Sequence, residues 1–470
     1  MIKVLKNPKI LLLLILLFSF FWRFLNYQNR WVFNQDQARD AVIASYALQN
    51  HLLPLLGSPS SAGPFNFGPL YDWLIMAVTF LFPFASGPWV GFTLIFSLTP
   101  LLFYFIGKNV YHKNFGLLLA AITAFCPAQV ANAPDMLNTT IVFFAVTLAF
   151  FFLSFYLKNS RLIFAYFFAF SIGLAQNFHF QSLGLFSLLL TAFLINRLKL
   201  FPRLKLGLTF TAGYLTAFIP ILIFDFTHRH VWITSVFNYY TGGVNKFFVP
   251  IRWLTDLRDF WPQTWGEIIT NIPALGYLLL AIFIFTFVLS FKKGYPQFRF
   301  FWIVLLSLLI QVVLMRYYKG VRSREYLIFL HAYFIFLTAW SLYFLPKPLS
   351  AIFIILFLIV TSVFNFNLVY QHPSQVQKIY TLKKSIDLNY PGQLAIYSLP
   401  TLDMAAMPIF YLYYRENKIN PAGTPIQITI DPQNNYFASP LSSPSATLKL
   451  YTPKSIYNRL FINYPSALTR

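Results

Sequence analysis

The stretch N-Q-D-Q-A-R-D, residues 34 to 40, directly follows the first long apolar run of a 470-residue chain that has only 13 acidic residues. Asn34 can cap a helix, and Gln37 three positions later can bond back to the cap, so the sequence predicts a helix from Gln35 to Asn50. Because this polar helix follows an apolar run of membrane-spanning length, we expect it to lie along the outer membrane interface.

Three charged side chains lie on one face of this expected helix, since Asp36, Arg39 and Asp40 are separated by three and four positions. Asp36 falls in the first turn, where the helix dipole favours an ionised carboxylate. Two interpretations remain open at this point. The group is either the solvated start of a helix whose charges satisfy one another, or a set of carboxylates with a function beside the membrane.

The composition is that of a polytopic α-helical membrane protein. Hydrophobic residues make up 58%, charged residues only 10%, and the mean hydropathy is +0.61, whereas soluble proteins are about 25% charged. The net charge of +22 sits in short basic clusters between apolar runs, which orient membrane helices and argue against nucleic acid as a partner. Cys126 is the only cysteine, which excludes disulfides and cysteine-based zinc sites.

Apolar runs of spanning length predict about 11 transmembrane helices in residues 1–370. The first run is expected to be a retained helix, not a signal peptide, because no small-residue cleavage site follows it. The run 70–84 is interrupted by Asp72 and bounded by prolines, so we expect an interfacial or re-entrant helix within a first outer loop at 27–87. The expected crossings are 9–26, 88–107, 114–131, 138–157, 161–176, 181–196, 205–224, 273–291, 299–315, 325–345 and 349–370.

Basic loops predict the orientation in the cytoplasmic (inner) membrane, with the N-terminus inside. The loops that carry Lys108 and Lys158 then face the cytoplasm, and every Asp and Glu lies on the outer face or in the tail. From residue 371 to 470 the composition shifts, which predicts a small C-terminal α/β domain on the outer face. Its expected helices are 375–388 and 403–414, and its expected strands are 394–398, 426–430 and 447–451.

Asp135 lies in the short connection A-N-A-P-D-M-L-N-T, residues 131 to 139. A connection this short holds the carboxylate close to the membrane surface. The alternative is that Asp135 caps the span that begins near Asn138.

Four polar side chains of Q-N-F-H-F-Q, residues 176 to 181, lie between apolar runs: Gln176, Asn177, His179 and Gln181. His179 and Gln181 need partners or a cavity at that depth, so we expect them to line a substrate cavity. The alternative for His179 is an ordinary hydrogen-bonded interface residue.

A basic cluster follows at Arg316, Lys319, Arg322 and Arg324 on the expected outer side, against the usual charge bias. The planar guanidinium of arginine can donate two parallel hydrogen bonds to a phosphate, and the ammonium group of lysine adds a positive charge. The cluster therefore predicts binding of a lipid phosphate. The alternative is that these side chains extend to ordinary lipid headgroups.

Three motifs together resemble the GT-C superfamily of membrane glycosyltransferases, in particular bacterial relatives of the protein O-mannosyltransferases and the lipid A aminoarabinose transferase. They are the acid after the first span, G-P-L-Y-D-W-L at 68–74 and P-D-M-L-N at 134–138. The resemblance covers about residues 1–370 and implies that Asp36 is catalytic. Gln37 replaces the family's usual Glu, and 68–74 lacks the family's basic residue. Asp135 matches the family's acid after the third span.

The resemblance and the outer-face residues together predict a glycosyltransferase of the cell envelope. A polyprenyl-phosphate sugar carries its own leaving group, so the protein needs a base for an acceptor hydroxyl and cations for the phosphate. Asp36 is the expected base, and Asp135 orients the acceptor. If a divalent cation takes part, which the sequence leaves open, Asp36 and Asp135 are its expected ligands. The expected substrate cavity is formed by Arg39, Asp40, Tyr71, Asp72, His179 and Gln181.

The predicted reaction is an inverting displacement on the outer face, with a lipid-linked sugar as donor and a glycan, lipid or protein as acceptor. The alternative is a polytopic transporter or lipid flippase. Transporters tend to show internal repeats and ionisable groups at mid-membrane. This chain has no evident repeat, and its acids avoid the expected spans.

Overall fold

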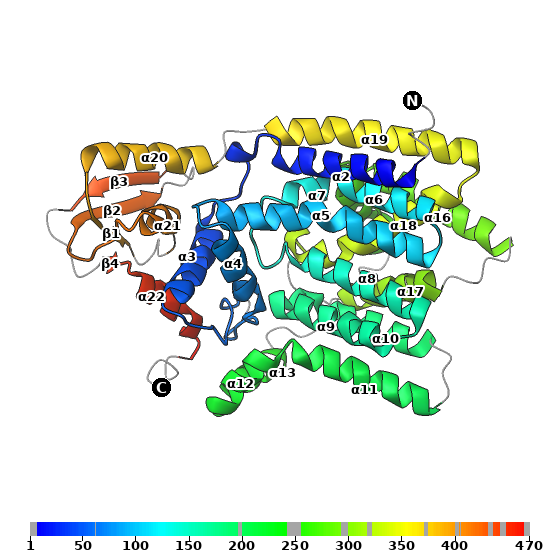
Figure 1. The fold of residues 1–470 in the computed structure, drawn as a ribbon, viewed down its shortest axis with the longest axis horizontal. Helices are drawn as coiled ribbons and strands as arrows, with labels where there is room; N and C mark the ends of the chain where they lie inside the picture. The colour runs from blue at the N-terminus through cyan, green and yellow to red at the C-terminus, as the bar shows by residue number, and fades with distance from the viewer. Residues whose placement is uncertain are drawn as a thin grey trace.

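The protein is described by a computed structural model, which covers residues 7–61, 63–195, 200–241, 255–292, 299–316, 322–370, 375–399, 404, 406–430, 436–441 and 448–464. Long helices lie side by side and form one body, and a sheet lies at one end of it (Figure 1). The described helices up to residue 370 are α2 (Pro8–Phe24), η1 (Tyr27–Asn29), α3 (Gln35–Gln49), α4 (Leu70–Leu81), α5 (Gly87–Val110), α6 (Lys113–Phe125), α7 (Pro127–Asn132), α8 (Val142–Asn159), α9 (Leu162–Phe178), η2 (Phe180–Leu185), α10 (Phe186–Ile195), α11 (Leu200–Thr216), α12 (Ile219–Thr227), α13 (Val231–Thr241), η3 (Asp256–Phe260), α15 (Trp261–Thr270), α16 (Leu275–Lys292), α17 (Arg299–Arg316), η4 (Arg324–Leu330), α18 (His331–Phe344) and α19 (Lys347–Tyr370).

Five of the described helical segments are long and apolar enough to cross a membrane, and two bent pairs raise that number to seven. The bent pairs are α11 with α12, at 66°, and η3–α15 with α16, at 100°. Several other expected crossings fall on shorter apolar helices, such as α6 and α9. The protein is therefore a helical membrane protein, and the number of about 11 crossings stays a prediction. The helix expected at 70–84 forms as the short helix α4, and its position at the membrane interface stays a prediction.

The first helix is fixed to the body by a buried arginine. The side chain of Asn7 caps α2 by accepting a hydrogen bond from the Lys9 backbone at 3.0 Å. Near the other end of α2, Arg23 donates to the carbonyl oxygens of Ala124 and Thr123, each at 3.1 Å. These carbonyls belong to the last turn of α6, where carbonyl oxygens have no N–H partner within the helix. The helix dipole also makes a cation favourable at this end.

Aromatic residues anchor the start of α3. Trp31 and Phe33 pack against Trp89 of α5, with ring centroids 4.7 and 5.3 Å apart. Trp89 also donates its indole N–H to the Val32 carbonyl at 2.6 Å. Because all three rings are buried, the first residues of α3 have a fixed position on the helical body.

The tail contains a four-stranded sheet with the strand order β3-β2-β1-β4. Strand β1 pairs in parallel with β2 and antiparallel with β4, and β2 pairs antiparallel with β3. The tail elements are α20 (Gln375–Asn389), β1 (Leu394–Ser398), α21 (Met407–Arg415), β2 (Thr424–Ile430), β3 (Tyr436–Pro440), β4 (Lys449–Leu450), α22 (Pro453–Tyr457) and η6 (Asn458–Phe461). Every expected tail helix and strand has a counterpart here, although positions 403 and 447 lie outside the described residues. That 371–470 forms a separate domain stays a prediction.

The tail packs directly on α3 and on the loop that follows α4. The Tyr411 hydroxyl donates to the Ala85 carbonyl at 2.8 Å, the Tyr414 hydroxyl donates to Gln49, and Arg415 donates to the Pro83 carbonyl. Tyr457 of α22 stacks near Tyr46 with ring centroids 5.2 Å apart. Figure 1 shows α3 and α4 between the helical body and the tail elements α21 and α22.

Candidate functional site

One guanidinium joins the two acids of α3. Arg39 donates from Nη1 to Asp36 and from Nε to Asp40, each at 2.7 Å. Ser58, from the following loop, donates to Asp40 at 3.0 Å. The prediction that the three charged side chains share one face is therefore confirmed, and the loop after α3 adds a fourth member that the helical spacing could not reveal.

The two acids have opposite surroundings. The Asp36 side chain is 61% exposed, whereas that of Asp40 is 2% exposed. Burial raises the pKa of Asp40, and the adjacent Arg39 acts in the opposite direction. Asp36 is consequently the carboxylate that an incoming molecule can reach. Asp40 holds the Arg39 guanidinium in place from the protein interior.

Gln37 bonds to Asp135 instead of to its own helix start. Its Nε2 donates to Asp135 at 2.8 Å, and Asn34 occupies the cap position without a side-chain cap bond to the described residues. The expected capping box was therefore wrong, because the Gln37 side chain is buried against the body and finds a carboxylate there. Burial raises the pKa of Asp135 to about 7; the bond from Gln37 lowers it and the nearby Glu325 raises it.

Tyr71 and Asp72 lie in the packed interior at the start of α4. The Tyr71 hydroxyl donates to the Met136 carbonyl at 2.9 Å and so fixes the connection that carries Asp135. Neither carboxylate oxygen of Asp72 has a hydrogen-bond partner among the described residues. Burial, followed by the charge of Asp40, raises the pKa of Asp72 well above its ordinary value. That these two residues face a substrate stays a prediction.

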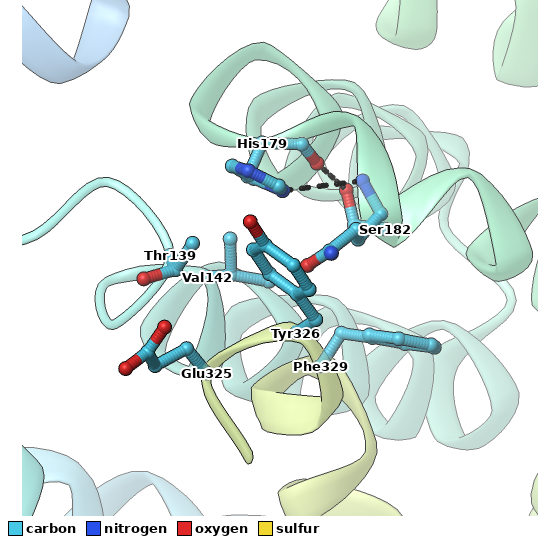
Figure 2. Close-up of a pocket in the computed structure, with 8 residues that line it drawn as sticks. Thr139, Val142, His179, Ser182, Glu325, Tyr326 and Phe329 are labelled. Atoms are coloured by element: carbon cyan, nitrogen blue, oxygen red, sulfur yellow. Dashed lines mark hydrogen bonds between the residues drawn. The ribbon is translucent and has the colours of Figure 1, made fainter. Parts of the chain in front are cut away.

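His179 and Gln181 line a small open recess, with room for about one water, between η2, the start of α8 and η4 (Figure 2). The His179 ring lies 4.6 Å from the ring of Phe67 and 5.6 Å from that of Tyr326, measured between centroids. Burial lowers the pKa of His179 to about 4, so the imidazole is neutral at physiological pH. The remaining lining residues are Thr139, Val142, Ser182, Glu325, Tyr326 and Phe329.

Glu325 is the charged lining residue that was not among the residues predicted for the substrate cavity. It directly follows Arg324, and the four basic residues before it led to an interpretation of the whole stretch as a phosphate-binding cluster. Its exposed carboxylate, seen at the edge of the recess in Figure 2, lies close enough to Asp135 to raise the pKa of that group.

Two members of the basic cluster have carboxylate partners on the segment η3–α15. Arg322 donates to both oxygens of Asp256, at 2.9 and 3.1 Å, and lies 4.1 Å from the Phe260 ring centroid. Arg324 pairs with Glu267. These partners are about 60 positions away in the sequence and could not be found from spacing. Arg316 is buried at the end of α17, and Lys319 lies outside the described residues.

The carboxylates do not make a metal site from protein ligands alone. Within the described ranges, no group of three or more His, Cys, Asp or Glu side chains is placed to hold a metal ion. Asp36 is bonded to Arg39 and Asp135 to Gln37. The donor set therefore does not fit a protein-built cation site, and no mechanistic step is derived through one.

No family model and no curated protein matches the chain. Solved structures do match. The oligosaccharyltransferase of Archaeoglobus fulgidus in complex with Zn and sulfate has a TM-score of 0.50 at 13% identity, over 88% of this chain and 62% of that one. The archaeal oligosaccharyltransferase AglB of the same organism, in complex with an inhibitory peptide and a dolichol-phosphate, gives 0.50 at 10% identity, over 96% and 77%. ArnT from Cupriavidus metallidurans bound to undecaprenyl phosphate gives 0.52 at 13% identity, over 86% and 75%.

The chain has the GT-C fold. The matched oligosaccharyltransferases and ArnT share the fold that the resemblance of the three sequence motifs implied. At 10 to 13% identity the likeness concerns the fold. The chain spans 62% of the length of the first oligosaccharyltransferase chain, less than two thirds. Within this fold, Gln37 joins Asp135 to α3, the helix that also carries Asp36.

Proposed function

We propose that the protein is a glycosyltransferase that moves a sugar from a polyprenyl-phosphate donor to an acceptor hydroxyl on the outer face of the cytoplasmic membrane. The observation that carries the proposal is the exposed Asp36 carboxylate, oriented by Arg39 on a helix that is also bonded to Asp135. Two proteins of the same fold were solved with dolichol-phosphate and with undecaprenyl phosphate, which supports a lipid phosphate as part of the donor.

In the proposed reaction, Asp36 accepts the proton of the acceptor hydroxyl while the hydroxyl oxygen attacks the anomeric carbon. The bond from that carbon to the phosphate oxygen breaks, and polyprenyl phosphate leaves with the electron pair. One displacement inverts the configuration of the sugar. Arg39 holds the Asp36 carboxylate in one orientation. This lowers the entropic cost of reaching a reactive geometry with the acceptor hydroxyl.

Asp135 is proposed to orient the acceptor, because its carboxylate is bonded to Gln37, the neighbour of the base. Arg316, Arg322, Arg324 and Lys319 are the proposed contacts of the donor phosphate. Arg322 and Arg324 are already paired with carboxylates. A phosphate that binds them therefore shares or replaces an existing carboxylate partner, which requires an anionic group such as the phosphodiester of the donor or the phosphate of the leaving group.

The test is an assay of the purified full chain in detergent with a panel of polyprenyl-phosphate sugars and hydroxyl acceptors. We expect release of polyprenyl phosphate together with a glycosylated acceptor of inverted configuration. The result that overturns the proposal is folded protein that cleaves no donor of the panel. Movement of uncleaved lipid-linked sugar across a vesicle membrane would support a flippase instead.

A further inference from the structure

A short hairpin lies beside the charged residues of α3. It consists of the stretches 57–60 and 65–68, which pair antiparallel. The Phe67 N–H donates to the Ser58 carbonyl at 3.0 Å, and the Ser58 hydroxyl donates to Asp40. Because Ser58 and Asp40 are both buried, water does not replace this bond readily, and the placement of Asp40 depends on the placement of the hairpin.

Asn66 joins this hairpin to the tail. Its amide nitrogen donates to the Gly57 carbonyl at 2.7 Å and to the Leu460 carbonyl of η6 at 2.8 Å. Its amide oxygen accepts a hydrogen bond from the Asn463 side chain at 3.0 Å. The two N–H groups and the carbonyl oxygen of the amide are thus all bonded. One fully buried side chain therefore binds the first stretch of the hairpin on one side and the tail on the other.

The helical body holds the second stretch of the hairpin. Asn177, in the last turn of α9, accepts hydrogen bonds from the Gly68 N–H at 2.8 Å and from the Leu70 N–H at 3.0 Å. Trp232 of α13 donates to the Asn66 backbone carbonyl at 2.9 Å. These bonds fix the backbone of the second stretch, whereas the Asn66 side chain is oriented by its own partners, two of which belong to the tail. The tail therefore controls whether the amide keeps its bond to the first stretch.

We propose that Asn66 is a positioning residue through which the tail orients the proposed base. The tail fixes the Asn66 amide, the amide fixes the stretch that carries Ser58, and Ser58 holds the buried Asp40. Through Arg39 this order reaches the exposed Asp36. The inference rests on the reaction proposed above, in which Asp36 is the base. It gives the tail a part in turnover: without the bonds at Asn66, the base stays accessible but loses its fixed orientation.

A tail that only stabilises the protein would give a different result. Either role loses stability when a bond at Asn66 is removed, because buried polar groups are left unpaired. Only the positioning role also lowers kcat of the protein that stays folded. The KM of the donor should change little, since the fully buried Asn66 side chain cannot touch a substrate.

The test compares the full chain in detergent as wild type, Asn463→Ala and Tyr411→Phe, with the polyprenyl-phosphate sugar that the wild type uses. Each substitution removes one hydrogen bond from the tail, to Asn66 in the first case and to the Ala85 carbonyl in the second. We expect Asn463→Ala to lower kcat by about tenfold or more, since a misplacement of about 1 Å can cost about 10²-fold. Tyr411→Phe should keep kcat, because its bond does not lead to the hairpin.

A double substitution tests the path itself. Ser58→Ala removes the bond through which the hairpin reaches Asp40. Adding Asn463→Ala to it should lower kcat no further, because both substitutions break the same path. Tyr411→Phe should act independently of Ser58→Ala. If Asn463→Ala and Ser58→Ala multiply their effects on kcat, the tail acts by another route and the inference is overturned.

Hydrogen exchange gives a readout that needs no turnover. The Phe67 amide, which is bonded within the hairpin, should exchange faster in Asn463→Ala than in the wild type and at an unchanged rate in Tyr411→Phe. Asn463 is partly exposed, so its variant is expected to fold. Unchanged kcat in folded Asn463→Ala protein would overturn the inference, whatever the exchange rate. Faster exchange in a protein whose wild type cleaves no donor would overturn the proposed reaction, while the connection from the tail to the hairpin would stand.

Discussion

At the scale of single residues, Arg39 bonds two acids that lie one helical turn apart and have different roles. It bonds Asp40 in the interior and Asp36 at the surface with equal distances of 2.7 Å. The buried acid fixes the guanidinium, and the guanidinium orients the exposed acid. An arrangement of this kind lets Asp36 stay accessible without being free to rotate, which is what a base for an incoming hydroxyl needs.

Asp36→Asn is predicted to reduce turnover by ~10² to 10⁴ while the protein stays folded, because the amide keeps the shape and removes the base. The measurement is the steady-state rate of lipid phosphate release. Asp40→Asn serves as the matched control, and we expect it to lower the midpoint of thermal unfolding because Arg39 loses the buried one of its two charged partners. Near-normal turnover of folded Asp36→Asn protein would return this residue to the role of a solvated helix start.

Asp135 is predicted to make stability depend on pH. Burial raises its pKa to about 7, above the ordinary value of about 3.9. Between these values the folded chain retains a proton that the unfolded chain releases. The stabilising contribution is therefore fully present below about pH 4 and is lost as the pH rises through about 7.

The measurement compares thermal unfolding of the wild type and Asp135→Asn in detergent from about pH 5 to about pH 8. The unfolding midpoint of the wild type should fall relative to that of the variant as the pH rises, because the amide does not titrate. Asp40 and Asp72, whose pKa values are also raised, are present in both proteins and cancel in the difference. Parallel curves would contradict the raised pKa.

At the scale of elements, the sequence predicted helices and strands whose positions depend on neighbouring residues. The helix expected at 35–50 forms as α3, and the strand expected at 394–398 forms as β1 with the same bounds. The partner of Gln37 was not predictable, because the capping rule considers only neighbours in sequence and Asp135 lies 98 positions away. The acids opposite the basic cluster, Asp256 and Glu267, were missed for the same reason.

The pairing of η4 with η3–α15 allows a sharp test of the phosphate contacts. Arg322→Ala is predicted to weaken binding of the polyprenyl-phosphate donor by about 1–3 kcal/mol, the range for a charge-assisted hydrogen bond. Asp256→Asn should keep donor affinity unchanged or increase it, since it leaves the guanidinium and its contact with Phe260 in place and removes the competing charge. Equilibrium binding of a labelled donor checks both variants.

If Arg322 has only a structural role, it holds the start of η4 against η3 through its ion pair with Asp256. Both substitutions would then remove that ion pair and should weaken donor binding alike. If it only extends to ordinary lipid headgroups, neither should change donor affinity. The predicted contrast between the two variants therefore separates a phosphate contact from both alternatives.

At the scale of the whole molecule, helices that carry acids lie at one end. The helices that carry Asp40, Asp72 and Asp387 gather at the end away from the N-terminus (Figure 1). Two loops expected on the cytoplasmic side also meet, since Lys158 donates to Asn109, the neighbour of Lys108, at 3.1 Å. The basic loops and the acids were assigned to opposite faces from sequence. Helix number was harder to predict, because short and bent helices do not follow the length rule.

The orientation is tested by labelling intact cells with a membrane-impermeant maleimide. In a Cys126→Ala background, Ser385→Cys on α20 should be labelled from outside, whereas Asn159→Cys at the end of α8 should react only after permeabilisation. Both positions are exposed, so accessibility is decided by the side of the membrane and not by packing. The parent without added cysteine is the control for background. Labelling of Ser385→Cys only after permeabilisation would reverse the orientation and bring Asp36 to the cytoplasmic face, where the proposed outer-face reaction could not take place.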